Sequence, residues 1–242
     1  MVRTLGESWG EDAALPLPGG ELRERARRLR LVLTDSDGVL TDGGVYYSDS
    51  GEALRRFSVR DGMGVERLRE AGIATAIVTR ETTGCVERRS AKLRLPYLFL
   101  GVRDKAAQLP AILAETGLEV DTLAYIGDDV NDLGIMAAIG ERGLTAAPAD
   151  AMPEVLAACH YRCTARGGHG AFRDFAEWIL ALRREPPGDV ATDRAHAESA
   201  AGEGAEQAPA DARARAGAAL GAAGEPALPG AARQAAEQQE EP

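Results

Sequence analysis

The stretch Leu31-Val32-Leu33-Thr34-Asp35-Ser36-Asp37-Gly38 decides the fold of this chain. Its first four residues form a short apolar run before a turn-favouring glycine, a pattern typical of a buried parallel strand. Asp35 and Asp37 therefore follow the carboxyl end of a strand, where open α/β sheets place their ligands. Two carboxylates on one turn can hold a hard divalent cation and leave an oxygen free to attack. The same residues also favour ordinary turns, so the rest of the chain has to decide.

Composition divides the 242 residues into three parts. Residues 1–20 are predicted to be a flexible N-terminus, 21–184 one folded domain, and 185–242 a disordered tail. From Pro186 onward Ala, Gly, Glu, Gln and Pro dominate, and too little apolar surface remains to offset the entropy of ordering. Residues 186–242 have ten acids and four arginines, so they hold −6 of the formal net charge of −10.

Several classes of protein are disfavoured. The acidic balance argues against nucleic-acid binding. The N-terminus lacks a secretory signal pattern, and no apolar run has the ~18 residues needed to span a bilayer. The cysteines Cys85, Cys159 and Cys163 have no metal-site spacing and are interpreted as thiols in a reducing compartment. We therefore expect a cytoplasmic protein with neither a membrane nor a nucleic-acid partner.

Short apolar runs alternate with helical patterns along the domain. Strands are predicted at 31–34, 73–79, 97–100, 123–126, 143–147 and 160–163. Helices are predicted at 21–30, 62–71, 82–95, 104–116, 131–139, 152–158 and 170–184. Residues 45–47 and 54–59 flank a turn-like segment and predict a β-hairpin inserted after the first strand. The alternation predicts an α/β fold, a Rossmann-like doubly wound parallel sheet with right-handed crossovers.

Reactive groups follow four of these strands. The first gives Asp35 and Asp37, the second Thr79, the third Lys105, and the fourth Asp128, with Asp129 and Asp132 close behind. Parallel strands end at one edge of a sheet, so these groups can converge. Carboxylates suit Mg²⁺, and an ammonium and a hydroxyl suit a phosphoryl group. Phosphoryl transfer depends mainly on such positioning and charge stabilisation.

This order of motifs resembles the haloacid dehalogenase superfamily of phosphohydrolases across residues 31–182. It is most similar to a capless, tetrameric branch that cleaves phosphate from 3-deoxy-ulosonic acids. The likeness to that branch is carried by four further stretches: Thr41-Asp42-Gly43-Gly44, Val59-Arg60-Asp61-Gly62-Met63-Gly64, Tyr125-Ile126-Gly127-Asp128-Asp129-Val130-Asn131-Asp132 and Arg166-Gly167-Gly168-His169-Gly170-Ala171.

The resemblance implies a role for each matched residue. Asp35 would be the nucleophile that forms an aspartyl-phosphate, and Asp37 would serve first as acid and then as base. Asp35, the backbone carbonyl of Asp37, and Asp128 would bind Mg²⁺. Thr79 and Lys105 would bind phosphate, and Asp132 would support the site.

Substrate choice within the branch is expected to depend on Glu81 and Lys92. Nononate phosphatases are similar to this chain in having Glu at the first position and Lys eleven residues later. The favoured substrate is therefore 2-keto-3-deoxynononate 9-phosphate, a small phosphorylated sugar acid. The alternatives are 3-deoxy-manno-octulosonate 8-phosphate, N-acylneuraminate 9-phosphate or another small phosphate. Further substrate contacts are expected from Arg60, Arg89 and the loop 167–170.

One departure and two alternatives remain. Arg80 stands where the family usually has a glycine that lets the backbone approach phosphate. A phosphoacceptor receiver domain also uses acids, a hydroxyl and a lysine, but its acids lie on different strands. A catalytically idle assembly module of an acylneuraminate cytidylyltransferase system is the other alternative. We expect a homotetramer built through the hairpin segment 46–59, because a capless core leaves its site open.

Overall fold

The computed structural model describes residues 19–184. The expected disordered tail, 185–242, lies outside the described residues. So does the expected flexible N-terminus, apart from Gly19 and Gly20, which open the first helix. Within the described part, no helix is both long enough and apolar enough to cross a bilayer.

Six parallel strands form the central sheet, in the order β5-β4-β1-β6-β7-β8. The strand β1 (Leu31–Thr34) lies between β4 (Ala74–Val78) and β6 (Leu123–Ile126), and all four of its residues are buried. The outer strands are β5 (Tyr97–Phe99), β7 (Leu144–Ala147) and β8 (Tyr161–Arg162). Central strands covered on both faces need apolar residues throughout, which is why the sequence shows continuous apolar runs.

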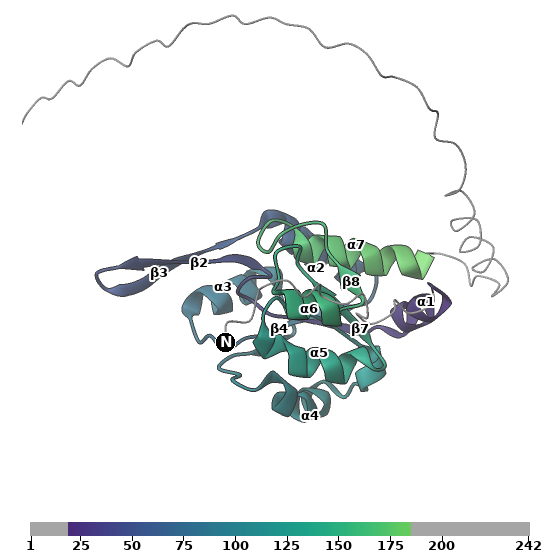
Figure 1. Cartoon of the computed structure of the whole chain (residues 1–242). Coiled ribbons are helices and arrows are strands. Elements are labelled where there is room, and N and C mark those ends of the chain that lie inside the picture. The colour runs from purple at the N-terminus through teal and green to yellow at the C-terminus, as the bar shows by residue number, and fades with distance from the viewer. Residues whose placement is uncertain (1–18, 185–242) are drawn as a thin grey trace, which may run out of the picture. The chain divides into compact units, whose positions relative to one another are not determined.

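Helices cover both faces of this sheet (Figure 1). The face of the sheet to which Val32 points packs against α1 (Gly19–Arg28), α2 (Val59–Glu70), α3 (Gly84–Leu93) and α7 (Ala171–Arg184). The Leu31 and Leu33 face packs over α4 (Lys105–Thr116), α5 (Leu133–Gly140) and α6 (Pro153–Ala158). Successive residues of one strand therefore contribute to different core layers, and the predicted doubly wound sheet is confirmed.

The predicted hairpin is also confirmed. Strands β2 (Thr41–Ser48) and β3 (Gly51–Phe57) pair antiparallel as a separate two-stranded sheet. The hairpin projects from the helical layers in Figure 1. Its large apolar residues are exposed, with Tyr47 at 75% and Leu54 at 64%. Among the described residues, the insertion between β1 and α2 consists of this hairpin alone, and no cap domain is present.

Two predicted boundaries were wrong for local reasons. The hairpin was expected to continue through Val59, but β3 ends at Phe57 because Ser58 caps α2, accepting a hydrogen bond from the Arg60 amide at 3.1 Å. The helix expected at 131–139 is split into a 3₁₀ turn, η2 (Val130–Asp132), and α5. A second short 3₁₀ turn, η1 (Val120–Thr122), leads into β6.

Candidate active site

Three strand ends line one cleft of about 410 Å³ at the carboxyl edge of the sheet. Its lining includes Asp35 after β1, Thr79 after β4 and Asp128 after β6. A larger hollow of about 480 Å³ runs along residues 98–108. Asp104 is the one acid lining that hollow, and its carboxylate caps α4. The smaller cleft is therefore the candidate for chemistry.

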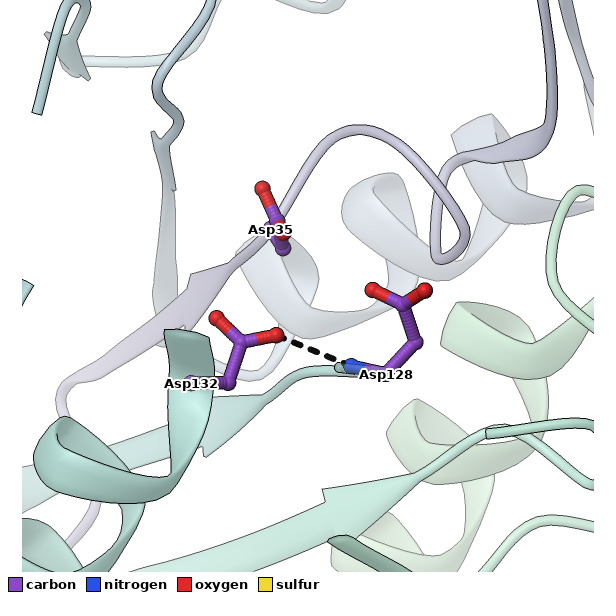
Figure 2. A group of neighbouring side chains, drawn as sticks. All are labelled: Asp35, Asp128 and Asp132. Carbon is purple, nitrogen blue, oxygen red and sulfur yellow. Dashed lines mark hydrogen bonds between the residues drawn. The ribbon is translucent and has the colours of Figure 1, made fainter. Parts of the chain in front are cut away.

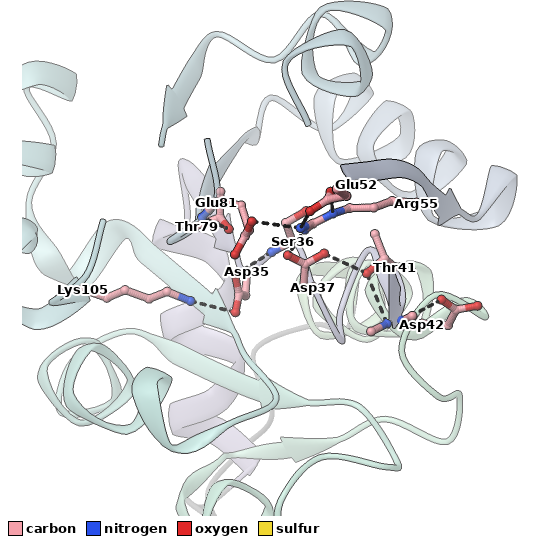
Figure 3. A network of polar contacts seen from close by, with 12 residues as sticks. Asp35, Ser36, Asp37, Thr41, Asp42, Glu52, Arg55, Thr79, Glu81 and Lys105 are labelled. Atoms are coloured by element: carbon pink, nitrogen blue, oxygen red, sulfur yellow. Dashed lines mark hydrogen bonds and ion pairs between the residues drawn. The ribbon is translucent and has the colours of Figure 1, made fainter. Parts of the chain in front are cut away.

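A buried lysine links two carboxylates beneath this cleft. Lys105 Nζ lies 2.8 Å from Asp35 Oδ2 and 2.6 Å from Asp132 Oδ1, and the residue is 1% exposed. Burial alone would lower the pKa of Lys105, but Asp35 and Asp132 outweigh it and raise the pKa. Lys105 therefore stays an ammonium and places a fixed positive charge beside Asp35 (Figure 3).

Both carboxylate oxygens of Asp132 accept hydrogen bonds from neighbouring groups. Besides Lys105, its Oδ1 accepts the Tyr125 hydroxyl at 2.6 Å, and its Oδ2 accepts the Asp128 and Asp129 amides at 3.0 and 3.3 Å. Figure 2 shows the Asp132 carboxylate turned toward the Asp128 backbone. Asp132 thus orients the backbone that carries Asp128. The buried Tyr125 was missed because a tyrosine in an apolar run looks like an ordinary core residue.

The acidic cluster has the properties of a divalent-cation site. Oxygens of Asp35, Asp128 and Asp132 lie within 4.8 Å of one another, and Asp128 Oδ1 is buried without a hydrogen-bond partner among the described residues. Burial raises the pKa of Asp128 to about 8, with Asp35 and Asp132 adding to the shift and Lys105 opposing it. Burial likewise raises the pKa of Asp35. A cation between these acids would be a partner for the unpaired Asp128 oxygen and would offset the repulsion between the carboxylates. The donor set therefore fits a metal ion.

The structure explains why the first motif ends in a glycine, Gly38. Its φ of +79° is rare for other residues, and a Cβ there would lie 1.9 Å from Asp128 Oδ2. The turn after β1 can therefore approach Asp128 only with glycine at this position. Proximity between the first and last motifs depends on this contact.

Asp37 lies on the other side of the cleft and contacts the hairpin. Its Oδ1 accepts a hydrogen bond from the Thr41 hydroxyl at 3.1 Å, and its Oδ2 is paired with the Arg55 guanidinium (Figure 3). Arg55 also contacts Glu81 Oε2 at 2.9 Å. Sequence reasoning missed Arg55, because charged residues surround it in a strand whose two faces are mostly exposed.

Thr79 lies where a phosphate-binding hydroxyl is needed. It is 1% exposed, and its Oγ1 accepts the Glu81 amide at 3.2 Å, which leaves the hydroxyl proton free to be donated. Arg80 also lines the cleft and is exposed. The residue that replaces the usual glycine thus adds a cation at the cleft.

Known proteins are similar to this chain in sequence and in fold. A 3-deoxy-D-manno-octulosonate 8-phosphate phosphatase from Yersinia pestis is 38% identical over 157 residues, which are 65% of this chain and 82% of the relative. A hydrolase of the haloacid dehalogenase superfamily, subfamily III A, from Legionella pneumophila superposes with a TM-score of 0.62 at 35% identity, covering 67% of this chain and 88% of the other. This chain belongs to the haloacid dehalogenase superfamily, in the branch of these octulosonate phosphatases. No family model matches it.

The predicted enzyme class is confirmed: the chain is a phosphoric monoester hydrolase. A third similar structure, from Moraxella catarrhalis, contains a magnesium ion, a phosphate ion and 3-deoxy-D-manno-octulosonate. It has a TM-score of 0.63 at 30% identity and covers 74% of this chain and 98% of the other. Phosphatases of this superfamily use a divalent metal, and the acidic cluster of this phosphatase matches that need.

Three of the expected substrate contacts do not line the cleft of the phosphatase. Lys92 is exposed on α3 and has no ion pair with Glu81 among the described residues, since Glu81 pairs with Arg55. Arg89 donates to the Ser58 carbonyl at 2.7 Å and stacks over Phe57, so it fastens α3 to the start of α2. Arg60 is exposed in the first turn of α2.

The glycine-rich loop 167–170 packs against the turn that carries Asp37. The Gly168 amide donates to the Val39 carbonyl at 2.8 Å, and a Cβ on Gly167 would lie 1.8 Å from the Gly38 carbonyl oxygen. Only glycine permits this approach. In the phosphatase this loop therefore braces the turn that follows β1 in its own chain.

Proposed function

We propose that this phosphatase hydrolyses the phosphomonoester of a 3-deoxy-ulosonic sugar acid, with Mg²⁺ as its cofactor. The observation that carries the proposal is the position of Asp35, which has the buried Lys105 ammonium on one side and an orphaned oxygen of Asp128 on the other. Lys105 and a bound cation would neutralise the negative charge of a phosphoryl group beside Asp35, the proposed nucleophile.

The proposed reaction has two steps. An Asp35 oxygen forms a bond to phosphorus while the ester P–O bond breaks, and Asp37 gives its proton to the departing alkoxide. Asp37 then takes a proton from water, the water oxygen bonds to phosphorus, and the bond to Asp35 breaks to release phosphate. Thr79 and Lys105 hold the phosphoryl oxygens. A Mg²⁺ ion held by Asp35, Asp128 and the backbone carbonyl of Asp37 would neutralise charge there.

The first candidate substrate is 3-deoxy-D-manno-octulosonate 8-phosphate, since relatives with this activity in their names cover most of the domain. The second is 2-keto-3-deoxynononate 9-phosphate, which the sequence favoured through Glu81 and Lys92. Glu81 lies at the mouth of the cleft beside Asp37's partner Arg55, so it is placed to accept hydrogen bonds from sugar hydroxyls.

Assembly into a homotetramer through the hairpin is part of this proposal. Large apolar side chains crowd its two strands, and Tyr46, Tyr47 and Leu54 are 56%, 75% and 64% exposed. Exposed apolar clusters of this kind mark interaction surfaces. Light scattering of the purified protein tests the mass, and an active monomer at low concentration would contradict the assembly.

A substrate panel tests the proposal directly. Rates are measured on the octulosonate, nononate and acylneuraminate phosphates and on an unrelated sugar phosphate, with Asp35→Asn as the blank. We expect one ulosonic acid phosphate to exceed the unrelated phosphate by at least about tenfold in kcat/KM, and EDTA to abolish turnover until Mg²⁺ is restored. A flat, slow profile would favour the idle assembly module, and EDTA-resistant activity would contradict the metal site.

A further inference from the structure

Both oxygens of the Asp37 carboxylate are held by the hairpin. Oδ1 accepts the hydroxyl of Thr41, the first residue of β2, and Oδ2 is paired with Arg55 of β3. The Thr41 hydroxyl in turn accepts the Gly43 amide at 3.2 Å, which fixes the direction of its proton toward Asp37. The proposed acid and base is thus clamped by one residue from each hairpin strand, as Figure 3 shows.

Arg55 is a buried charge despite its place on an exposed hairpin. Its side chain is 2% exposed and contacts Asp37, Glu81 and, at 2.7 Å, Glu52. Burial alone would lower the pKa of Arg55, but the hydrogen bonds that it donates to Glu52 and Asp37 outweigh burial and raise the pKa. A guanidinium held by three carboxylates has little freedom to turn, since its planar fork fixes the direction of each contact.

We infer that Arg55 and Thr41 are positioning residues that hold the Asp37 carboxylate in the orientation needed for proton transfer to the leaving oxygen. A free aspartate carboxylate rotates in a broad torsional well, whereas general acid catalysis requires hydrogen-bond geometry to the reacting atom. The hairpin therefore does more than present an assembly surface. The inference rests on the proposed role of Asp37 and assigns the hairpin a part in that step.

The dependence of the rate on the leaving group tests this inference. An alkoxide needs a proton as it departs, whereas 4-nitrophenolate departs without one, and kcat/KM reports the step that releases the leaving group. Arg55→Met removes the charge at similar length. We expect it to lower kcat/KM by about 10²-fold for the sugar-acid phosphate and by less than about fivefold for 4-nitrophenyl phosphate, because only the first reaction uses the acid.

Three further variants separate positioning from folding. Arg55→Lys keeps a cation and should recover part of the loss on the alkyl substrate. Thr41→Val should show the same selective loss at smaller size, while Thr41→Ser keeps the hydroxyl and stays near wild type. Arg142→Met removes an exposed arginine whose carboxylate partner, Asp121, lies 3.8 Å away and outside the cleft, and it should leave both rates within about twofold.

Equal losses on both substrates in Arg55→Met and Thr41→Val would overturn the inference, as would full activity of both. If Arg55→Met does not fold, the comparison of Thr41→Val with Thr41→Ser decides. A wild type inactive on every ulosonic acid phosphate contradicts the proposed substrate class instead. The leaving-group comparison is then made with a simple alkyl phosphate that the wild type hydrolyses, and a wild type that hydrolyses none overturns both proposals.

Discussion

The two aspartates of the first motif lie two residues apart but belong to different environments. Around Asp35, the partners Lys105, Asp132 and Tyr125 come from the sheet and its helices, and each is at most 1% exposed. We call these four residues the phosphate side. Around Asp37, the partners Thr41 and Arg55 come from the hairpin, and Glu81 beyond them is 40% exposed at its side chain. We call these the leaving-group side.

The difference follows the chemistry of the reaction. Every phosphomonoester presents the same phosphoryl group, so the residues that handle it can be fixed in the core without limiting the substrate. The leaving group varies, and Asp37, the proposed acid, is held by an insertion that can change without disturbing the sheet. Four variants test this division, and we take them from the largest expected effect to the smallest.

Lys105→Met should harm the fold as well as the reaction. It leaves Asp35 and Asp132 buried without their shared cation, and breaking a buried pair in this way costs about 3–5 kcal/mol. Urea unfolding measures the loss, and turnover should be undetectable. A change in unfolding free energy below about 1 kcal/mol would break the comparison, since the phosphate side would then not be part of the core.

Asp37→Asn should affect the reaction alone. The amide keeps hydrogen-bonding groups for Thr41 and Arg55 but cannot move a proton, so kcat should fall roughly 10²- to 10⁴-fold. Because Asp37 is proposed to offer the metal only its backbone carbonyl, Mg²⁺ affinity by calorimetry should stay near wild type. Loss of metal binding with turnover, or near-normal turnover, would remove its acid and base role.

Tyr125→Phe should destabilise the phosphatase by about 1–3 kcal/mol, because it leaves a buried Asp132 oxygen with one hydrogen bond fewer. Tyr47→Phe on the hairpin is the matched control, since the Tyr47 side chain is exposed and the same atom is removed. The control should change the unfolding free energy by less than about 0.5 kcal/mol. Equal effects of the two substitutions would contradict the claim that the phosphate side is part of the buried core.

Asp174→Asn should give the smallest effect, and one that depends on pH. Asp174 accepts hydrogen bonds from Thr164 and Tyr161 and anchors the segment leading to the glycine-rich loop. Burial alone would raise the pKa of Asp174, but these hydrogen bonds outweigh it and lower the pKa below 3.8. Its contribution to stability is therefore present above that value and lost as pH falls through the folded pKa. Thermal unfolding from pH 7 to pH 3 should show the variant approaching wild type, and a constant gap would contradict this.

On the phosphate side, Asp35, Lys105 and Asp132 could be predicted from the sequence, and so could Thr79 and Asp128 in the adjoining cleft. Asp35, Thr79, Lys105 and Asp128 each follow a short apolar strand, and a parallel sheet brings strand ends to one edge whatever the loops do. Their catalytic roles stay predictions until the variants are measured. Tyr125 could not be found because its apolar neighbours make it look like core, and its partner Asp132 is seven residues away.

The leaving-group side could not be predicted in the same way. The register of the hairpin shifts twice, between Thr41 and Val45 and between Tyr46 and Tyr47, so alternation along β3 does not tell which side chains face the cleft. Arg55 was overlooked for this reason. Lys92 was grouped with Glu81 through the resemblance to nononate phosphatases, but α3 places Lys92 on an exposed surface.

Gly38 limits how this enzyme can evolve. A methyl group on its Cα would collide with the Asp128 carboxylate, and one on Gly167 would collide with the Gly38 carbonyl from another direction. Neither glycine can gain a side chain unless its neighbours move. Arg80 and Glu81 line the cleft without this constraint, which means that substrate preference can change while the turn at Gly38 stays the same.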